Sequence, residues 1–195
     1  MQKQILSSRM LPRSTNVNFL FTEETSLGAN MVLIADEEEK VRDALSVAVH
    51  RWAQEEQRNI ETVKLENGQQ TIDSVHHMVR YRKPPLLVIA DLRMPGMSGV
   101  DVAQTINNKY ARIPMIITAS YDEHDESLIQ KADDFADQYS HVSFIIRTQS
   151  SPLLKVVLES EIRNILSKPS THREDTQSQF GALKKKLTKL WNNSF

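Results

Sequence analysis

The 195 residues allow one full domain of about 150 residues and about 40 more beyond it. A composition of 39% apolar and 25% charged residues excludes collagen-like, wholly disordered and membrane-spanning proteins. The absence of cysteine excludes a disulfide scaffold, a cysteine zinc site and thiol catalysis, and it fits a reducing compartment, so we expect a cytoplasmic protein. The net charge of −1 combines +1 over residues 1–30, −6 over 31–167 and +4 over 168–195, which predicts an acidic domain with a basic tail.

Residues 1–30 are polar and rich in Ser, Thr and Asn, and they lack both a sustained hydrophobic period and the apolar run of a secretory signal. We interpret them as a flexible N-terminal arm. A weak transit peptide and a dispensable segment before a domain that begins at Met31 are the alternatives.

After this arm, short apolar runs alternate with helical patterns, which is typical of a parallel sheet built from βα units. Residues 31–36 predict a buried strand that ends in an acid, and apolar residues at three- and four-residue spacing over 41–52 predict a helix. Residues 60–68 alternate in polarity and predict a second strand, which stops at the turn signal Asn67-Gly68.

A second helix over 72–79 is predicted to end at Lys83-Pro84-Pro85, because proline disfavours helical geometry in the residue before it. Residues 86–91 are nearly all apolar and predict a central strand buried on both faces. The remaining predictions are a helix over 99–109, a strand over 113–120, a helix within 123–140, a strand over 142–147, and a helix from Ser151 with Ser150 or Ser151 as N-cap and Pro152 in its first position.

Five strands and five helices in strict alternation predict an α/β fold, a doubly wound five-stranded parallel sheet with helices on both faces. The binding crevice of such a sheet lies beyond the carboxyl ends of its strands, near a switch point in strand order. Polar residues stand at these ends: Asp36-Glu37 at the first strand, Asp91 at the third, Thr118-Ala119-Ser120 at the fourth and Arg147 at the fifth.

Three acids, a hydroxyl and a cation are therefore predicted to meet in one small crevice. Neighbouring carboxylates raise one another's pKa unless a positive charge joins them, and Mg²⁺ favours carboxylate and phosphoryl oxygens. Asp91, at the tip of the central strand, could attack phosphorus and become an aspartyl phosphate. Mg²⁺, Thr118 and Arg147 would balance the transferred charge.

The segment DLRMPGMSG at 91–99 resembles the phosphoacceptor loop of bacterial two-component response-regulator receiver domains, the class that includes the chemotaxis regulators. VLIADEEEKVRDAL at 32–45, ENGQQTI at 66–72 and IITAS at 116–120 resemble that family's first strand with its acid pair, its second turn and its fourth strand. The likeness covers about residues 31–167 and implies a flavodoxin-like sheet with strand order 2-1-3-4-5.

The resemblance implies that Asp91 accepts a phosphoryl group from a histidine kinase or a phosphotransfer protein. It also implies a Mg²⁺ ion held by Asp36, Glu37, Asp91 and the backbone carbonyl of Arg93. Thr118 is similar to the hydroxyl that moves toward the phosphoryl group, and the small Ala119 would leave the site open to a donor.

Further positions follow from the same resemblance. Phe144 takes the place of the aromatic switch residue on the fifth strand, which repacks when the threonine moves, and the loop that shapes the site is matched by Met94, Pro95 and Gly99. The signalling face would lie around the fourth helix, the fifth strand and the fifth helix, where a downstream protein would bind.

The chain departs from the family's pattern in two places. Arg147-Thr148 stands where the family has a lysine-proline pair; arginine keeps the charge but is bulkier and forked, and no cis proline can form there. The segment before Arg147 is also longer than usual. An alternative alignment places residues 132–135 before the fifth strand, but we favour the one through Phe144, because FII is apolar enough for a buried strand.

Several of these residues also have purely structural interpretations. The acidic run 36–39 alone would be a helix start with favourable charges, Thr118 an ordinary strand residue and Phe144 a core residue. The six histidines show no ligand spacing, so we expect no histidine metal site.

The C-terminal segment is predicted to be a polar linker over 168–179 and then a basic amphipathic helix. Its partner would be an acidic protein surface, the acidic domain itself or an anionic membrane; a disordered tail is the alternative. It is too short for a helix-turn-helix domain, so we expect no specific DNA binding. The interacting residues would be Phe180, Leu183, Lys184, Lys185, Lys186, Leu187, Lys189, Leu190 and Trp191.

Taken together, these features predict a single-domain response regulator that signals through phosphorylation-dependent protein–protein interaction. It would not be an enzyme, beyond assisting its own aspartyl phosphorylation and dephosphorylation. The alternative is a degenerate receiver, a constitutive scaffold without phosphorylation, which Arg147-Thr148 favours. A phosphohydrolase built on Asp91 is disfavoured, because Arg93 stands two residues on where a second acid would be needed.

Overall fold

The computed structural model describes residues 30–110, 112–120, 123–147 and 151–167. Within this part of the chain, five strands alternate with five helices as predicted. The predictions of an N-terminal arm, a C-terminal linker and helix, and a helix cap at Ser150, together with Thr148, lie outside the described residues. The elements are β1 (Met31–Ala35), α1 (Glu39–Glu55), β2 (Glu61–Leu65), α2 (Gly68–Arg80), β3 (Leu87–Asp91), α3 (Gly99–Lys109), β4 (Met115–Ala119), α4 (Glu126–Gln138), β5 (Val142–Ile146) and α5 (Ser151–Ser167).

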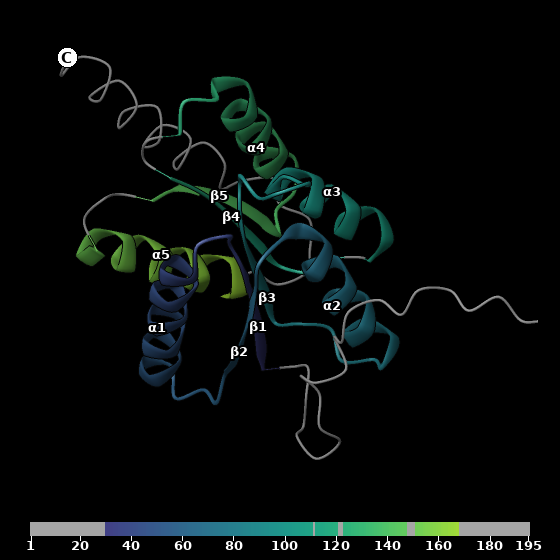
Figure 1. Cartoon of the computed structure of the whole chain (residues 1–195). Helices are drawn as coiled ribbons and strands as arrows, with labels where there is room; N and C mark the ends of the chain where they lie inside the picture. Colours follow the sequence, from purple (N-terminus) through teal and green to yellow (C-terminus); the bar gives the residue numbers. More distant parts are fainter. Residues whose placement is uncertain (1–29, 111, 121–122, 148–150, 168–195) are drawn as a thin grey trace, which may run out of the picture.

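The strands form one parallel sheet in the order β2-β1-β3-β4-β5. Helices α1 and α5 cover one face of this sheet, and α2, α3 and α4 cover the other (Figure 1). The strand order reverses between β1 and β3, which makes their carboxyl ends the topological switch point where ligands bind in doubly wound sheets. The predicted fold class and strand order are confirmed.

The burial of strand β3 explains the environment of the residue at its carboxyl end. All five of its residues are buried; Val88 and Ala90 join the core toward α2, α3 and α4, while Leu87 and Ile89 join the core toward α1 and α5. Alternating side chains therefore bury both faces of the strand, as the continuous apolar run predicts. Asp91 ends this strand, so its carboxylate has the apolar core behind it.

Helix α2 differs from the prediction at both ends. Asn67 and Gly68 do not form a separate turn: the Asn67 side chain caps the helix by accepting the Gln70 N–H at 3.0 Å, and Gly68 is the first helical residue. The helix ends at Arg80, before the proline pair, because Arg82 adopts a left-handed conformation (φ 57°) and bonds back to the last turn.

The structure decides between the two alignments of the fifth strand. Residues 132–135 lie within α4, whereas Phe144 lies on β5, beside Ile117 of β4 in the sheet register. Phe144 packs in the core between the sheet and the helices α2, α3 and α4. None of the described helices is long and apolar enough to cross a membrane.

Candidate functional site

Three neighbouring strands bring the predicted acids and hydroxyl to one edge of the sheet. Ala35 of β1 pairs with Ala90 of β3, so Asp36 and Asp91 are the next residues along adjacent strands. Thr118 of β4 is the register partner of Asp91. The predicted convergence of these side chains therefore follows directly from the parallel ladder.

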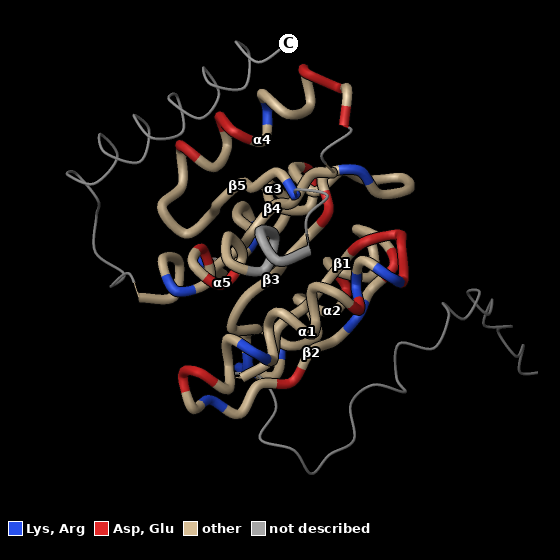
Figure 2. The backbone as a smooth tube through the Cα atoms, turned by 90° about the vertical axis from the view of Figure 1, so that its left-hand side faces the viewer, with Lys and Arg blue, Asp and Glu red and all other residues tan. Residues whose placement is uncertain are grey.

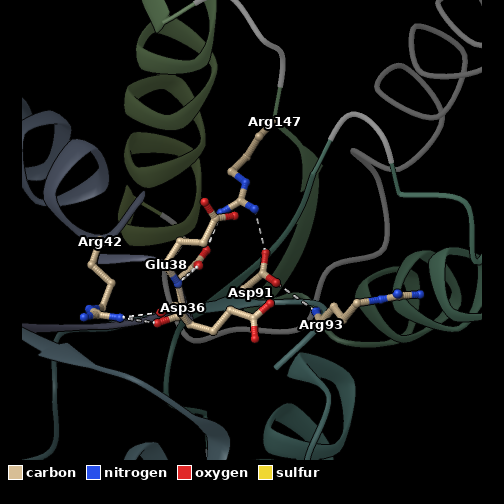
Figure 3. A network of polar contacts seen from close by, with 7 residues as sticks. Asp36, Glu38, Arg42, Asp91, Arg93 and Arg147 are labelled. Atoms are coloured by element: carbon tan, nitrogen blue, oxygen red, sulfur yellow. Dashed lines mark hydrogen bonds and ion pairs between the residues drawn. The ribbon is translucent and has the colours of Figure 1, made fainter. Parts of the chain in front are cut away.

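Asp36 is buried in the turn between β1 and α1, and two local contacts hold it there (Figure 3). Its Oδ1 accepts the Glu38 N–H at 2.9 Å. The Arg42 guanidinium nitrogen Nη1 donates to the backbone carbonyls of Asp36 and Glu37 at 2.7 and 3.0 Å. Arg42 is buried, and we did not predict its role from the sequence. The available signal was an arginine one turn into a helix that follows an acidic loop.

Replacing Arg42 by methionine is expected to lower the free energy of unfolding by about 2 kcal/mol, because two carbonyls lose a charged donor in a buried place. Methionine keeps most of the apolar stem. Urea denaturation measures the effect, and Arg51→Met, at an exposed position of the same helix, is the control and should change stability by less than about 0.5 kcal/mol. Equal effects of the two changes would show that the carbonyl contacts contribute nothing.

Arg147 lies just after β5, and its side chain enters the same space. Its backbone N–H donates to the Ala119 carbonyl at 2.7 Å, which anchors the end of β5 to the end of β4. Its Nη1 lies 2.5 Å from Asp36 Oδ2, and its Nη2 lies 3.0 Å from Asp91 Oδ1 (Figure 3). One guanidinium therefore bridges both buried carboxylates. The sequence predicts a cation here, but not that it bridges the pair.

Asp91 has an environment that favours its protonated form. Burial raises the pKa of its carboxyl from 3.8 to about 7, against the opposing effect of Arg147; nearby Asp36 and Glu37 raise it further. Oδ2 accepts the Arg93 N–H at 2.9 Å. The ion-pair contact of Oδ1 with Arg147 lacks hydrogen-bond alignment, so Oδ1 has no hydrogen-bond partner among the described residues.

Thr118 presents a second unsatisfied polar atom. Its side chain is fully buried, and its hydroxyl has no hydrogen-bond partner in the described part of the chain. Its carbonyl accepts the Leu92 N–H at 2.6 Å, which ties β4 to the start of the loop after Asp91. Burying a hydroxyl without a hydrogen-bond partner lowers the free energy of unfolding. Thr118 is therefore available as a donor to a group that enters beside Asp91.

The loop between β3 and α3 is held close to Asp91. Met94 is buried in the core and Pro95 is exposed. Gly99 is fitted so tightly that a β-carbon there would lie 2.5 Å from the backbone oxygen of Asp91. The exposed Arg93 side chain pairs with Glu123 at 3.0 Å, a link to the loop before α4 that the sequence did not predict.

Carboxylate oxygens are the ligand type that a hard cation prefers. Asp36 and Asp91 are both buried here, and Asp91 Oδ1 lacks a hydrogen-bond partner among the described residues. Glu37, the third predicted carboxylate, is exposed. No group of three His, Asp or Glu side chains in the described ranges is arranged to hold a metal ion. The structure therefore does not assemble the predicted carboxylate set, and the positive charge between the two aspartates is that of Arg147.

The family model of the response regulator receiver domain matches residues 32–139. The chain therefore belongs to the response regulator receiver domain family of two-component signalling, as the resemblance predicts. The matched segment ends before β5, so the positions of Phe144 and Arg147 are known from the sheet alone.

Individual relatives agree with this assignment. The phosphate regulon transcriptional regulatory protein PhoB of Pseudomonas aeruginosa is 28% identical over 153 residues, which are 73% of this chain and 62% of that protein. The chain thus matches less than two thirds of this relative's length.

Solved structures show the same fold at low identity. The phosphorylated cyanobacterial phytochrome response regulator RcpA is 17% identical, with a TM-score of 0.56 over 73% of this chain and 98% of that chain. The signal receiver domain of a signal transduction histidine kinase from Syntrophus aciditrophicus is 18% identical, with a TM-score of 0.54 over 77% of this chain and 99% of that chain.

Proposed function

We propose that this receiver takes a phosphoryl group on Asp91 from a histidine kinase or a phosphotransfer protein and signals by a phosphorylation-dependent change in protein binding. The observation that carries the proposal is a pair of buried polar atoms at the switch point: within the described residues, the Thr118 hydroxyl has no hydrogen-bond partner, and Asp91 Oδ1 has only its ion-pair contact with Arg147. Because Asp91 and Thr118 are register partners, one small ligand could reach both atoms.

The proposed step is a transfer of one phosphoryl group. A carboxylate oxygen of Asp91 forms a bond to phosphorus, the P–N bond of the donor phosphohistidine breaks, and its electron pair returns to the imidazole. The Thr118 hydroxyl then donates to a phosphoryl oxygen, and Arg147 pairs with the added negative charge. The resemblance adds a Mg²⁺ ion at Asp36, Asp91, Glu37 and the Arg93 carbonyl. The described residues do not assemble this set, so no part of the step is assigned to the ion.

The proposed output is a protein–protein contact at the face formed by α4, β5 and α5. Ile146 of β5 is 47% exposed, and Val156 and Val157 of α5 are 61% and 40% exposed, so this face carries apolar side chains that a partner could cover. Helix α4 beside them has four acidic residues and one lysine, visible as mostly red charged positions in Figure 2. The basic segment at 180–191 would add a contact to an acidic protein or an anionic membrane surface.

Other parts of the proposal rest on composition. We propose a cytoplasmic protein that turns over no separate substrate and assists only its own phosphorylation and dephosphorylation. The absence of cysteine supports the compartment. The relative PhoB is named a transcriptional regulatory protein, and that role is stated here of PhoB alone. That this chain binds no specific DNA stays a prediction.

One observation favours a second function. Arg147 already pairs with both buried aspartates, so one positive charge is present between them without a metal ion or a phosphoryl group. A receiver fixed in this state would act as a constitutive scaffold that binds its partner without phosphorylation.

A direct test uses the whole chain with Mg²⁺ and acetyl phosphate, followed by intact mass and by amide chemical shifts. The wild type is expected to gain the mass of one phosphoryl group and to change its shifts along β4 and β5, whereas Asp91→Asn is expected to do neither. Asp73→Asn, an exposed aspartate on α2, is the matched control and should behave as the wild type. No adduct on the wild type would reject phosphotransfer and favour the scaffold.

A further inference from the structure

The edge of the sheet at β5 presents apolar side chains to solvent. Within the described residues β5 pairs with β4 alone, and α4 and α5 lie on opposite sides of it (Figure 1). Ile146, the last residue of β5, points to the same side of the strand as Phe144, toward the layer of α4, and is 47% exposed. Val157 of α5 is 40% exposed. Among the described residues, these two side chains form the apolar centre of an uncovered surface.

Acidic side chains border this surface on α4. Glu126, Asp133 and Asp137 recur at spacings of seven and four residues, so they share one side of the helix. The helix packs on the sheet through Ala132 and Phe135. Because parallel strands are connected by right-handed crossovers, the connection from β4 through α4 to β5 turns the acidic side toward the β5 edge.

Helix α5 borders the same surface on its other flank. Val157 and the half-buried Glu161 are four residues apart and share one side of this helix. Arg163 lies on a different side, where it pairs with two acids of α1 at 2.6 and 2.8 Å. The β5 edge therefore combines an apolar centre with acidic side chains on both flanks. An occupant that fits it brings apolar side chains and positive charge.

The C-terminal segment at 180–191 has this chemistry. It holds four lysines and no acidic residue. Its sequence predicts an amphipathic helix with five large apolar side chains on one side: Phe180, Leu183, Leu187, Leu190 and Trp191. Those side chains lose contact with water when they pack on an apolar surface, and the lysines on the other sides remain available to neighbouring acids.

The linker at 168–179 is long enough to bring this segment to the β5 edge. It starts at the end of α5 and reaches about 40 Å when extended and about 20 Å as a flexible coil. Val157 lies ten residues before Ser167, which is about 15 Å along the helix axis. A short linker also keeps the effective concentration of the segment in the millimolar range, so weak contacts suffice to hold it in place.

We propose that the C-terminal segment docks on the α4–β5–α5 face of its own receiver domain and covers that face until a downstream protein displaces it. Its apolar side chains cover Ile146 and Val157, and its lysines pair with the acids of α4. The inference rests on the proposed function in one respect, that this face is the output surface. The docking itself requires no phosphorylation.

The test uses a single nitroxide label on the whole ¹⁵N-labelled chain. The native chain has no cysteine, so Asn193→Cys places the label at one position, just beyond the segment. The amide signals of Ile146 and Val157 are expected to broaden relative to the same sample after the nitroxide is reduced. Lys64 on β2, at the opposite edge of the sheet, is the internal control and should keep its intensity. A mixture of label-free ¹⁵N chain and labelled ¹⁴N chain should show no broadening, because the contact is within one chain.

Reversing one charge tests the acidic flank. Asp137→Lys is expected to lower the ratio of docked to free segment about threefold, the size of one surface ion pair, as measured by the broadening of Ile146. Added salt should lower it further in the wild type. Asp73→Lys reverses an exposed aspartate on α2 and is the matched control, which should keep the wild-type broadening.

Unbroadened signals of Ile146 and Val157 would overturn the inference. So would broadening in the mixed sample, which would make a second copy the occupant, or a label immobilised only by phosphatidylglycerol vesicles, which would make it a membrane. The failure of phosphotransfer looks different. Intact broadening in a chain that gains no phosphoryl group from acetyl phosphate would leave the docking and reject phosphotransfer. A phosphoryl adduct on a chain without broadening would do the reverse.

Discussion

Replacing Gly99 by alanine is expected to lower the free energy of unfolding by about 3 kcal/mol, at the upper end of the cost of overpacking. The new β-carbon would lie 2.5 Å from the Asp91 carbonyl oxygen and 3.3 Å from Ile117 Cγ2. The first contact is with backbone, which cannot rotate away. The start of α3 must therefore move from β3, and the loop that holds Asp91 must move with it. Urea denaturation and the amide shifts of residues 91–94 measure both effects.

Two other glycines give graded controls. Gly96→Ala meets no atom within 4 Å but has a φ of +78°, so it should cost about 1 kcal/mol in backbone strain. Gly68→Ala meets side-chain atoms of Val102 and Met97, which can shift, so its cost should be smaller than that of Gly99→Ala. A Gly99→Ala protein as stable as Gly96→Ala would contradict the close approach to Asp91.

In metal-free buffer, the contribution of Asp91 to folding stability is expected to fall as the pH rises from about 4 to about 7. Burial raises the pKa of its carboxyl from 3.8 to about 7 in the folded chain. Between these values the unfolded chain releases the proton while the folded chain keeps it, so rising pH favours unfolding. A shift of about three pH units corresponds to about 4 kcal/mol at most, present in full below pH 4 and lost above pH 7.

Asp91→Asn isolates this contribution because it removes the titrating group and keeps the shape. The variant should match the wild type near pH 4 and exceed its stability above pH 7, as measured by urea denaturation at a series of pH values. The partly buried His141, whose pKa is lowered by desolvation and by Arg112, contributes with the opposite sign in both proteins and cancels in their difference. A difference that does not change with pH would show that the folded pKa of Asp91 is not raised.

Most of the fold could be predicted because its signals are local. The apolar run at 86–91 indicates a strand buried on both faces, and the structure shows all five residues of β3 buried. The helical spacing at 99–109 gives α3 with the same bounds. Where the prediction differs, as at Asn67-Gly68, one residue type serves two purposes: asparagine starts turns and also caps helices, and only its bond to Gln70 distinguishes them.

The candidate site could be predicted in its members but not in its contacts. Asp36, Asp91, Thr118 and Arg147 were named because strand ends meet at one edge of a parallel sheet. The bonds from Arg42 to the loop carbonyls and the Arg93–Glu123 pair were not predicted. Each depends on loop paths and side-chain rotamers, which produce no periodic pattern in the sequence. The metal set was predicted from family resemblance, and the structure leaves Glu37 exposed while Arg147 occupies the position between the aspartates.

Local residue patterns predict the order of the elements, the buried central strand and the loop at 91–99 that resembles the family's phosphoacceptor loop, because hydrophobic period and a short motif are properties of neighbouring residues. The arrangement of charges in this site depends instead on the tertiary structure. Arg147 is 111 positions from Asp36, and whether a cation so distant in sequence bridges two carboxylates depends on how five strands pack and on one side-chain rotamer. Charge interactions act through space, and the chain order alone does not contain those distances.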